Sequence, residues 1–523
     1  MKQVLLILAL LALLQRVAPS SPNILLVLTD DLDHTLGSVN AALPQTQRLI
    51  GGNGATASNW FVHTPVCCPS RAELLTGRYF HNIRVHNHSQ HGCMFVNVST
   101  NTSLSPFYAT PEHQGWYFAP HFKALNYTVG VFGKHLNSDN PLSPPPGVDR
   151  WFVNGGGDYL NPSFSVANVD QVGTTVRFNN CSGATTDQHL HHGSCYSTSV
   201  IGNQTMAWVR RHVLSNNHRT TRSPFFAYVA LKAPHIQDGP GWPVAIPAPW
   251  HKGVFHGTKA PRTPNWNYTC TTCHWLIRTQ PTMTSEQCLR SDVLYASRLE
   301  ALLSVDDTVS DMIHELSALN VLNNTYVIFT SDHGFQFGQY GMPEGKWNAY
   351  EHDVRIPFLM RGPGIPAGSV YPGLGSNVDV MPTLLDLGGG GGVPPTSMDG
   401  ASVAAGFLGQ GTINMKTEQL IEYYGLGPVV RYEHLEDTPN NTFRVLRIID
   451  PNGPVNEKNL MYGEWTSLSW DYTNDLEEVE LFDLDKDPWQ LINIATKASN
   501  GLKQRLHERL AQLYACRGDE CRN

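Results

Sequence analysis

Two acidic segments of this sequence have the residue types needed to hold a metal ion. Asp30 and Asp31 follow one continuous apolar run, and Asp332 follows a second run late in the chain. Carboxylate oxygens are hard ligands, which suit Ca²⁺ or Mg²⁺ better than zinc. Taken alone, two adjacent acids at a strand end favour a turn or a helix cap. A cation site therefore needs support from a further matched segment.

That further segment contains a cysteine. Residues 67–78 read Cys-Cys-Pro-Ser-Arg-Ala-Glu-Leu-Leu-Thr-Gly-Arg. We expect a helix to begin around Pro69, because proline is favoured in the first turn of a helix. The positive end of that helix would stabilise an anion formed beside Cys67. The simpler alternative is a buried thiol next to a helix start.

The segment carries the complete signature of the sulfatase family, Cys-x-Pro-Ser-Arg followed after four residues by Thr-Gly, so the chain resembles that family. The resemblance implies a sulfuric ester hydrolase with a modified nucleophile. In sulfatases a formylglycine-generating enzyme oxidises the first cysteine, here Cys67, during secretion. The resulting aldehyde hydrates to a diol. One hydroxyl attacks sulfur, and deprotonation of the other expels sulfate by breaking the C–O bond, which is covalent catalysis with a built-in release step.

The resemblance also implies the ligands of a cation. The family pairs Asp-Asp near the N-terminus with Asp-Asn or Asp-His before a late glycine, and this chain has the Asp-His version. The implied ligands are Asp30, Asp31, the modified Cys67, Asp332 and His333. The implied cofactor is Ca²⁺, with Mg²⁺ as the alternative, acting as a Lewis acid on the diol and on one sulfate oxygen.

Four further residues match family positions in order along the chain. Arg71 lies in the signature, where the family's arginine stabilises the formylglycine alkoxide. Lys134, in a Gly-Lys element, resembles the lysine that contacts both nucleophile and sulfate. His235, in Ala-Pro-His, resembles a sulfate-binding histidine and is a plausible acid for the departing alcohol. Lys346 matches a second sulfate-binding lysine. Such cations are what electrostatic stabilisation of a sulfuryl group requires.

One branch of the family fits best. Many sulfatases have a histidine two residues after the Gly-Lys lysine, but this chain has Leu136 there. The order Gly-Lys-x-Leu-Asn is similar to the branch of glucosamine-6-sulfatases and extracellular heparan sulfatases. It leaves His135 as the candidate base for sulfate release. The implied substrate is the 6-O-sulfate of N-acetylglucosamine units in glycosaminoglycans, with aryl sulfates as artificial substrates. The alternatives are an arylsulfatase with another natural substrate, a phosphomonoester or phosphonate hydrolase of the alkaline phosphatase superfamily, and a non-catalytic glycan-binding protein.

These residues need a scaffold that brings distant segments together. Residues 23–29 and 326–331 are uninterrupted apolar runs, which are typical of strands buried on both faces. Apolar residues between 297 and 319 follow helical spacing. Strands alternating with helices predict an α/β fold with ligands at the carboxyl edge of the sheet. Shorter strands are expected at 129–132, 225–231 and 357–360. The family resemblance implies a large, mostly parallel mixed sheet flanked by helices, the alkaline-phosphatase-like sulfatase fold.

The glycine run at 388–392 predicts a flexible break, and the sequence pattern changes after it. Beyond about residue 411 we expect short β pieces such as 442–449, and a final helix over 508–515. The predicted organisation is a signal peptide over residues 1–20, a catalytic domain over 21–410 and a smaller α+β subdomain over 411–523.

The N-terminus predicts entry into the secretory pathway. A lysine at position 2 precedes an apolar run from Val4 to Leu14, followed by small residues, as in a signal peptide. That run is too short to span a bilayer, which needs about 20 apolar residues. We therefore expect no membrane span and a lysosomal or secreted protein. Candidate N-glycosylation sites are Asn87, Asn97, Asn101, Asn126, Asn180, Asn203, Asn267, Asn323 and Asn440.

The cysteines fit the same oxidising compartment, in which disulfides persist. Local candidates for pairing are Cys181 with Cys195 and Cys516 with Cys521, although connectivity cannot be deduced from sequence. The Cys-x-x-Cys at 270–273 has no second pair at zinc-like spacing, so a structural bridge is favoured over a metal or redox site.

Composition excludes other classes of protein. The 523 residues carry 36 basic and 44 acidic side chains, a formal charge of −8, which argues against a nucleic-acid partner. Hydrophobic residues make up 41% of the chain, enough for a substantial core. The expected partner is instead a sulfated carbohydrate.

Overall fold

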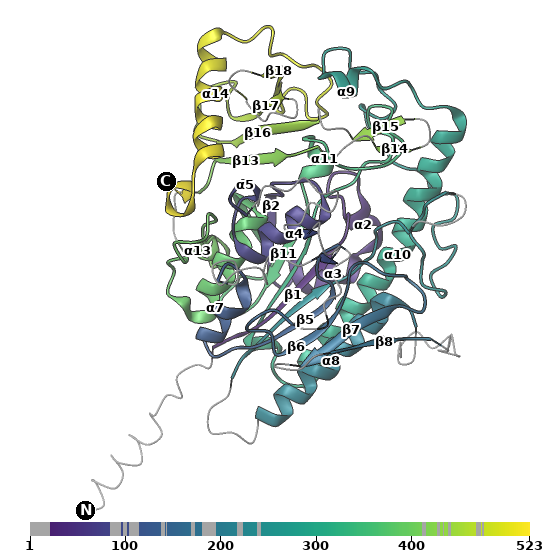
Figure 1. Cartoon of the computed structure of the whole chain (residues 1–523), viewed down its shortest axis with the longest axis vertical. Helices are drawn as coiled ribbons and strands as arrows, with labels where there is room; N and C mark the ends of the chain where they lie inside the picture. Colours follow the sequence, from purple (N-terminus) through teal and green to yellow (C-terminus); the bar gives the residue numbers. More distant parts are fainter. Residues whose placement is uncertain are drawn as a thin grey trace, which may run out of the picture.

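A computed structural model describes residues 21–83, 96–97, 102–103, 115–137, 142, 144–168, 173–179, 195–216, 223–237, 242–410, 415–425, 429–431, 434–437, 441–466, 472 and 475–522. The predicted signal peptide lies outside these residues. Two sheets dominate the described chain: a large central one and a smaller one above it in Figure 1.

Four buried strands form the centre of the large sheet. They are β1 (Asn23–Thr29), β10 (Thr325–Ser331), β9 (Phe225–Ala230) and β5 (Thr128–Lys134). β1 pairs in parallel with β10 and β9, and β9 pairs in parallel with β5. Their side chains are almost all buried because helices cover both faces, which explains the uninterrupted apolar sequence. Their carboxyl ends therefore meet at one edge of the sheet.

The sheet has ten strands in the order β12-β2-β11-β10-β1-β9-β5-β6-β7-β8. β11 runs antiparallel to both β10 and β2, and β7 and β8 add antiparallel pairs at the other end. The predicted mixed α/β fold is confirmed. The outer strands are β12 (Ser369–Ser376), β2 (Ala55–Phe61), β11 (Phe358–Arg361), β6 (Arg150–Asn154), β7 (Ser163–Asn168) and β8 (Thr174–Arg177).

Helices cover both faces of the sheet (Figure 1). One face packs on α8 (Ser197–Asn216) and α10 (Ser285–Ala318) and the other on α4 (Cys67–Thr76). Helix α10 begins well before the predicted residue 297, since Thr284 and Gln287 form a capping box at its N-terminus. Shorter helices are α2 (Ser38–Ala42), α3 (Pro44–Thr46), η1 (Gln47–Gly51), α5 (Phe80–Ile83), α7 (Phe118–Ala124), α9 (Trp275–Arg278), η3 (Leu322–Asn324), α11 (Glu351–Val354), η4 (Asn377–Asp379), α12 (Val380–Leu385), η5 (Asp386–Gly390) and α13 (Ala404–Phe407).

The glycine run interrupts the helical backbone within the segment where the sequence predicted a break. Helix α12 continues into η5, but Gly389 inside η5 has a left-handed φ of 101°, and Gly391 is left-handed as well. A left-handed residue after a helix is commonly glycine because glycine has no Cβ to clash there. The chain therefore leaves the helical conformation at Gly389.

The smaller sheet is antiparallel, in the order β13-β16-β17-β18, and packs against α14 (Asn500–Ala515). β16 matches its predicted range, whereas α14 begins earlier than predicted because Ser499 caps it. The boundary between residues 410 and 411 stays a prediction. The remaining elements are β13 (Glu418–Tyr423), β16 (Thr442–Ile449), β17 (Asn459–Thr466), β18 (Leu476–Asp483), β3 (Val96–Asn97), β4 (Thr102–Ser103), β14 (Val429–Arg431), β15 (His434–Asp437) and η6 (Gly518–Arg522).

The described cysteines fit an oxidising compartment. Cys270 bonds to Cys273 and Cys516 to Cys521, as predicted. Cys195 is disulfide-bonded, and its predicted partner Cys181 lies outside the described residues.

The predicted glycosylation sites differ in accessibility. Asn126 and Asn323 are exposed, and Asn203 and Asn267 are half-buried. Asn97 lies in β3, and its side chain is not described. All nine sites stay predictions. Outside the described residues lie Asn87, Asn101, Asn180 and Asn440.

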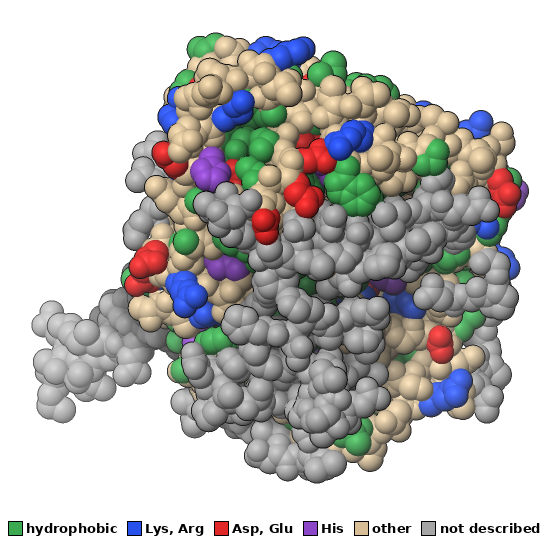
Figure 2. Space-filling model, turned by 45° about the horizontal axis from the view of Figure 1, so that its top comes forward, with side chains coloured by type: hydrophobic (Ala, Val, Ile, Leu, Met, Phe, Trp, Pro, Cys, Tyr) green, Lys and Arg blue, Asp and Glu red, His purple; other side chains and the backbone are tan. Residues whose placement is uncertain are grey.

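Two findings concern the surface. Among the described residues, no helix has the length and apolarity needed to cross a membrane. On the face shown in Figure 2, the described Lys and Arg side chains are dispersed among acidic ones rather than gathered into one broad basic patch.

An ion pair between His81 and Glu422 ties α5 to the smaller sheet, with Nδ1 2.9 Å from Oε1. Burial opposes the charged form of each group, yet the partner outweighs it and raises the pKa of His81 and lowers that of Glu422. The histidine contribution to stability is thus complete below its unfolded pKa of about 6.5 and is lost as pH rises through the folded pKa. The carboxylate contribution is present above about pH 4.3 and is lost as pH falls through its own folded pKa.

We therefore expect His81→Gln to lower the free energy of unfolding by about 1–3 kcal/mol near pH 5.5, because it removes a charged hydrogen bond. The difference from the unmodified chain should shrink by about 1 kcal/mol or more at pH 9. Urea denaturation at the two pH values measures it. His256→Gln, which changes an exposed histidine, is the control. If His81→Gln lowered the free energy of unfolding equally at both pH values, the result would contradict a charged pair.

Candidate active site

The predicted site residues meet at the carboxyl edge of the central strands. Asp30 and Asp31 directly follow β1, and Asp332 and His333 directly follow β10. The backbone N–H of Asp31 donates to Asp332 Oδ1 at 3.0 Å, and that of Asp332 donates to the Thr29 carbonyl at 3.1 Å. Parallel pairing of β1 and β10 therefore places both acidic segments side by side.

Cys67 reaches the same edge from β2 through a short loop. It is the first residue of α4, which therefore begins two residues earlier than the predicted start at Pro69. Pro69 is the third helical residue, where its missing N–H costs no intrahelical bond. Ser70 anchors the first turn through a hydrogen bond from Oγ to the Asp332 carbonyl at 2.5 Å. The thiol consequently lies at the positive end of a fully buried helix.

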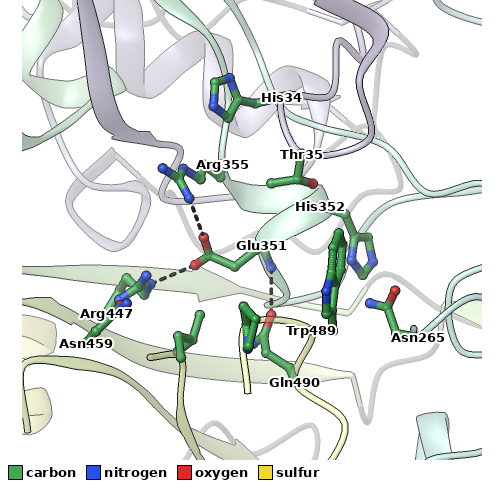
Figure 3. A pocket seen from close by; sticks show the side chains of 12 residues that line it. His34, Thr35, Asn265, Glu351, His352, Arg355, Arg447, Asn459, Trp489 and Gln490 are labelled. Carbon is green, nitrogen blue, oxygen red and sulfur yellow. Dashed lines mark hydrogen bonds and ion pairs between the residues drawn. The ribbon is translucent and has the colours of Figure 1, made fainter. Parts of the chain in front are cut away.

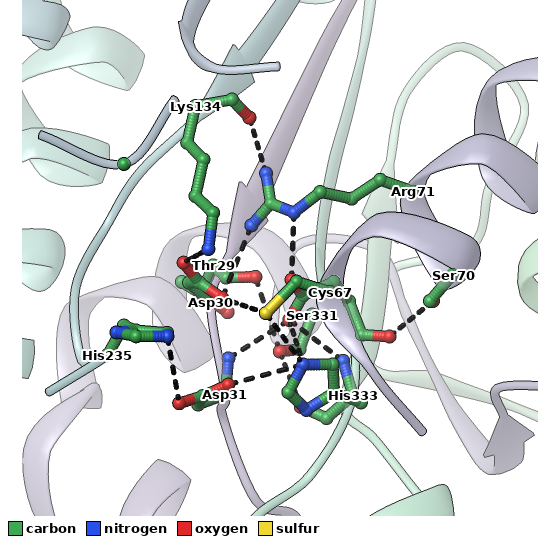
Figure 4. A network of polar contacts seen from close by, with 12 residues as sticks. Thr29, Asp30, Asp31, Cys67, Ser70, Arg71, Lys134, His235, Ser331 and His333 are labelled. Atoms are coloured by element: carbon green, nitrogen blue, oxygen red, sulfur yellow. Dashed lines mark hydrogen bonds and ion pairs between the residues drawn. The ribbon is translucent and has the colours of Figure 1, made fainter. Parts of the chain in front are cut away.

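Three polar side chains surround the Cys67 sulfur. His333 Nε2 lies 3.4 Å away and Asp30 Oδ1 3.5 Å (Figure 4). The third, Lys346 Nζ, lies 3.3 Å from the sulfur. Burial opposes ionisation of the thiol, but Lys134 and Lys346 outweigh it and hold its pKa well below the ordinary value. An anion at this position is therefore strongly stabilised.

The acids beside Cys67 are buried and balanced by cations. Lys134, at the end of β5, donates to Asp30, and Lys346 Nζ lies 2.6 Å from Asp31 Oδ1. Burial alone would raise both pKa values, but these lysines and His235 keep the pKa of each carboxyl below its ordinary value. Both side chains are thus carboxylates at neutral pH.

Asp332 differs from its two partners. Its Oδ2 accepts a 2.8 Å hydrogen bond from Arg71 Nε. Burial nevertheless raises the pKa of this carboxyl to about 6. Arg71 also donates to the Lys134 carbonyl, so it links α4, β5 and the segment after β10.

The donor set fits a divalent cation. Ligand atoms of Asp30, Asp31, Cys67 and His235 lie within 4.8 Å of one another, and so do those of Asp30, Cys67, Asp332 and His333. His333 Nε2 is 3.2 Å from Asp31 Oδ1, which brings the two sets together. Asp31 Oδ2 is buried and accepts no hydrogen bond from the described residues. Three carboxylates with one unused oxygen suit a hard cation.

His235 is the most open member of the cluster. Its side chain is 26% exposed, and Nε2 lies 3.8 Å from Asp31 Oδ2. Its ring is held by contact of Nδ1 with the Ile236 carbonyl at 2.5 Å. A proton donor facing both the cluster and solvent is positioned to serve a departing alcohol.

Sequence reasoning missed Arg298 of α10. This fully buried guanidinium donates to the Asp31 carbonyl and, at 3.1 Å, to the Pro234 carbonyl, so it fixes the loops after β1 and β9. The available signal was its spacing: Arg298 comes four residues after the buried Leu294 and four residues before the buried Leu302, so all three lie on one face of the helix. An arginine in the middle of an apolar helix face needs a specific partner.

His135 gains no support as the base for sulfate release. Its ring is fully buried, meets the edge of Trp151 with centroids 5.0 Å apart, and lies 3.1 Å from the Tyr117 hydroxyl. The remaining predicted residues, Arg71, Lys134, His235 and Lys346, all lie at the Cys67 cluster.

Comparisons with known proteins agree with this site. A family model described as Sulfatase matches residues 22–390. The N-acetylglucosamine-6-sulfatases of Capra hircus and Homo sapiens are 31% and 30% identical to the chain over 96% of it, and the match covers 85% and 86% of their own lengths. The Drosophila melanogaster extracellular sulfatase SULF-1 homolog is 35% identical over 73% of the chain and 31% of its own length.

A solved structure adds a match in fold. It is that of BT4656 in complex with its substrate D-glucosamine-2-N,6-O-disulfate, with a TM-score of 0.70. The match covers 96% of this chain and 98% of that chain at 20% identity. At that identity the likeness concerns the fold alone.

Proposed function

The chain belongs to the sulfatase family, and from that premise we propose that it hydrolyses the 6-O-sulfate of N-acetylglucosamine units in glycosaminoglycans. Members of the family are sulfuric ester hydrolases. The finer specificity is supported by the match along nearly the whole chain to two N-acetylglucosamine-6-sulfatases.

The observation that carries the proposal is the surroundings of Cys67. Its sulfur lies at the N-terminus of α4 and within 3.5 Å of Lys346, His333 and Asp30. Cys67 also occupies the position at which the family signature has the modified nucleophile. We propose that a formylglycine-generating enzyme converts Cys67 to formylglycine, which is hydrated in the working enzyme.

Each residue of the cluster has a separate role in the proposed reaction. One hydroxyl of the hydrated residue gives its proton to Asp30, whose Oδ1 lies 3.5 Å from the Cys67 sulfur, and attacks sulfur, while Lys134 and Lys346 neutralise the sulfate oxygens. His235 protonates the sugar oxygen as the S–O bond to the sugar breaks. His235, now neutral, then accepts the proton of the second hydroxyl, so that the C–O bond breaks, sulfate leaves and the aldehyde is regenerated. Arg71 holds Asp332 and the end of β5 in register throughout.

The proposed cation ligands are Asp30, Asp31, residue 67, Asp332 and His333. When bound, Ca²⁺ or Mg²⁺ supplies Lewis-acid stabilisation of the negative charge that develops in the reaction. Three carboxylates favour these hard cations over zinc. Placement in the secretory pathway, in lysosomes or outside the cell, is part of the same proposal, because formylglycine forms during secretion in this family.

The test is sulfate release by the chain co-expressed with a formylglycine-generating enzyme. We expect kcat/KM on N-acetylglucosamine 6-sulfate to exceed that on the 3-sulfate of the same sugar by about 100-fold or more, since a site built around one position discriminates strongly. Aryl sulfate should also be turned over, because a good leaving group needs little acid assistance. Turnover of aryl sulfate alone would indicate another natural substrate. A higher kcat/KM on phosphate or phosphonate monoesters would assign the chain to that other activity.

A further inference from the structure

A cavity of about 430 Å³ lies between α11 and the smaller sheet (Figure 3). We call it the lateral cavity. Its volume falls in the range of about 300–1,000 Å³ that is typical of small-ligand pockets. The lining residues are His34, Thr35, Asn265, Glu351, His352, Arg355, Arg447, Asn459, Leu484, Pro488, Trp489 and Gln490.

The lateral cavity is connected to the active site through the chain and through hydrogen bonds. His34 and Thr35 continue the segment that begins with the predicted cation ligands Asp30 and Asp31. On another wall, His352 Nε2 lies 3.3 Å from Gln336 Oε1, the same oxygen that accepts from Asn348 Nδ2. That amide also donates to the Lys346 carbonyl. One short chain of contacts thus joins the cavity wall to a lysine of the Cys67 cluster.

The charge of the cavity favours an anion. Glu351 accepts from Arg447 Nε at 2.7 Å and from Arg355 Nη1 at 3.5 Å, so two guanidiniums face one carboxylate. Burial lowers the pKa of His34 to about 4 and that of His352 to about 3, which leaves both rings neutral at physiological pH. The lining therefore carries one positive charge in excess.

The cavity also presents polar atoms with no partner. Gln490 is 2% exposed, and while its Oε1 accepts from the Glu351 backbone at 3.0 Å, its Nε2 has no partner among the described residues. His34 Nδ1, Thr35 Oγ1, Arg355 Nε and Asn459 Oδ1 are likewise buried and unpartnered. Buried polar groups are normally paired, so several such atoms around one space point to a polar ligand.

Trp489 supplies an apolar wall. Its half-buried indole stands beside His352 and Asn265 in Figure 3. A flat aromatic side chain among amide and guanidinium groups suits a ligand with both apolar faces and many hydroxyls, which is the chemistry of a sugar ring.

We infer that the lateral cavity binds a second, non-reacting unit of the substrate glycan, an acidic sugar whose carboxylate or sulfate faces Arg355 and Arg447. The inference rests on the proposed function, since it presupposes a sulfated carbohydrate at the Cys67 cluster. It predicts that oligosaccharides bind more tightly than a single sulfated sugar or an aryl sulfate.

Two matched pairs of variants test the cavity. Trp489→Ala removes the aromatic wall, and Trp489→Phe keeps it. Thr35→Glu cancels the excess positive charge, and Thr35→Gln has the same size without charge. We expect Trp489→Ala and Thr35→Glu to raise KM for a 6-O-sulfated glucosamine–uronate tetrasaccharide about tenfold, in line with loss of a buried aromatic anchor or of charge complementarity. Both should leave kcat and KM for an aryl sulfate within about twofold, and the Phe and Gln controls should stay near the unmodified chain.

Unchanged KM for the tetrasaccharide in Trp489→Ala and Thr35→Glu would overturn the inference. So would an equal loss on tetrasaccharide and aryl sulfate, because that pattern reports damage to the fold or to the Cys67 cluster. A carboxyl-reduced tetrasaccharide separates the two anions: loss of the Thr35→Glu effect assigns the carboxylate, and its persistence assigns a sulfate.

A binding measurement separates this inference from the proposed function. Calorimetry of the full chain carrying Cys67→Ala, with and without Thr35→Glu, measures tetrasaccharide affinity in the absence of turnover. If the wild-type sequence, co-expressed with the generating enzyme, hydrolyses no sulfate ester, the proposed function fails. Tetrasaccharide binding that is about tenfold weaker with Thr35→Glu, but not with Thr35→Gln, would still support the cavity as a saccharide site. Equal tetrasaccharide affinity in Cys67→Ala alone, with Thr35→Glu and with Thr35→Gln would refute the cavity as a saccharide site.

Discussion

Cys67→Ala is expected to lower kcat for every sulfate ester by about four orders of magnitude or more, because removal of a covalent nucleophile leaves only the binding and electrostatic contributions of the site. The side chain is buried at the start of α4, and alanine fits that space without a new polar group. The fold should therefore persist, with a melting temperature within a few degrees of the parent. Sulfate release and thermal denaturation measure the two effects.

Cys288→Ala is the matched control. Cys67 and Cys288 are the free cysteines among the described residues, and Cys288 lies on α10, only partly buried. Its replacement should leave turnover unchanged. Mass spectrometry of the peptide containing residue 67 should show the aldehyde in active protein and an unmodified thiol in protein made without the generating enzyme. Full activity with an unmodified thiol would refute the proposed nucleophile.

Much of the central sheet could be predicted because its strands are buried on both faces. The runs that became β1 and β10 contain consecutive apolar side chains over residues 24–28 and 326–329, so the pattern identified them. β2 was missed because its sequence mixes alanine with Thr56, Ser58 and Asn59. Its place in the sheet comes from pairing with β11 and β12, which are far away in the sequence.

The smaller sheet was harder to predict because it buries charged residues. Glu464 of β17 is fully buried and accepts from Arg444 of β16 at 2.7 Å. Glu480 of β18 is buried too and accepts a 2.6 Å hydrogen bond from the His274 backbone. Charged residues predict an exposed face unless the partner is known, and each partner here comes from another strand or a distant loop.

The site shows the same distinction between local and distant information. The Cys67 segment is contiguous, so a motif of consecutive residues identified both Cys67 and Arg71. Arg298 acts on the Asp31 carbonyl across 267 positions, and no local pattern encodes that contact. His135 was proposed because it adjoins position 136, where many sulfatases have a histidine, but its ring packs against Trp151 and lies 3.1 Å from the Tyr117 hydroxyl.

Asp31→Asn is expected to reduce turnover by about a thousandfold or more, because it weakens cation binding and with it several kcal/mol of charge stabilisation. Asp31 contributes one buried oxygen that accepts no hydrogen bond from the described residues and a second one beside His333 and Lys346. The amide keeps the shape but loses the charge that a hard cation requires. Lys346 would also lose its closest counter-charge.

Calcium-dependent stability provides a readout that is independent of turnover. A ligand at 100 times its dissociation constant stabilises a fold by about 2.7 kcal/mol. The unmodified chain should therefore unfold at a higher temperature with Ca²⁺ than with a chelator, and Asp31→Asn should lose most of that difference. Asp33→Asn is the matched control, since this buried carboxylate accepts from the Ser38 hydroxyl at 2.5 Å and is absent from the ligand clusters. If Asp33→Asn removed the calcium response and Asp31→Asn preserved it, the cation would have to bind elsewhere, and Asp31 would serve only as the counter-ion of Lys346.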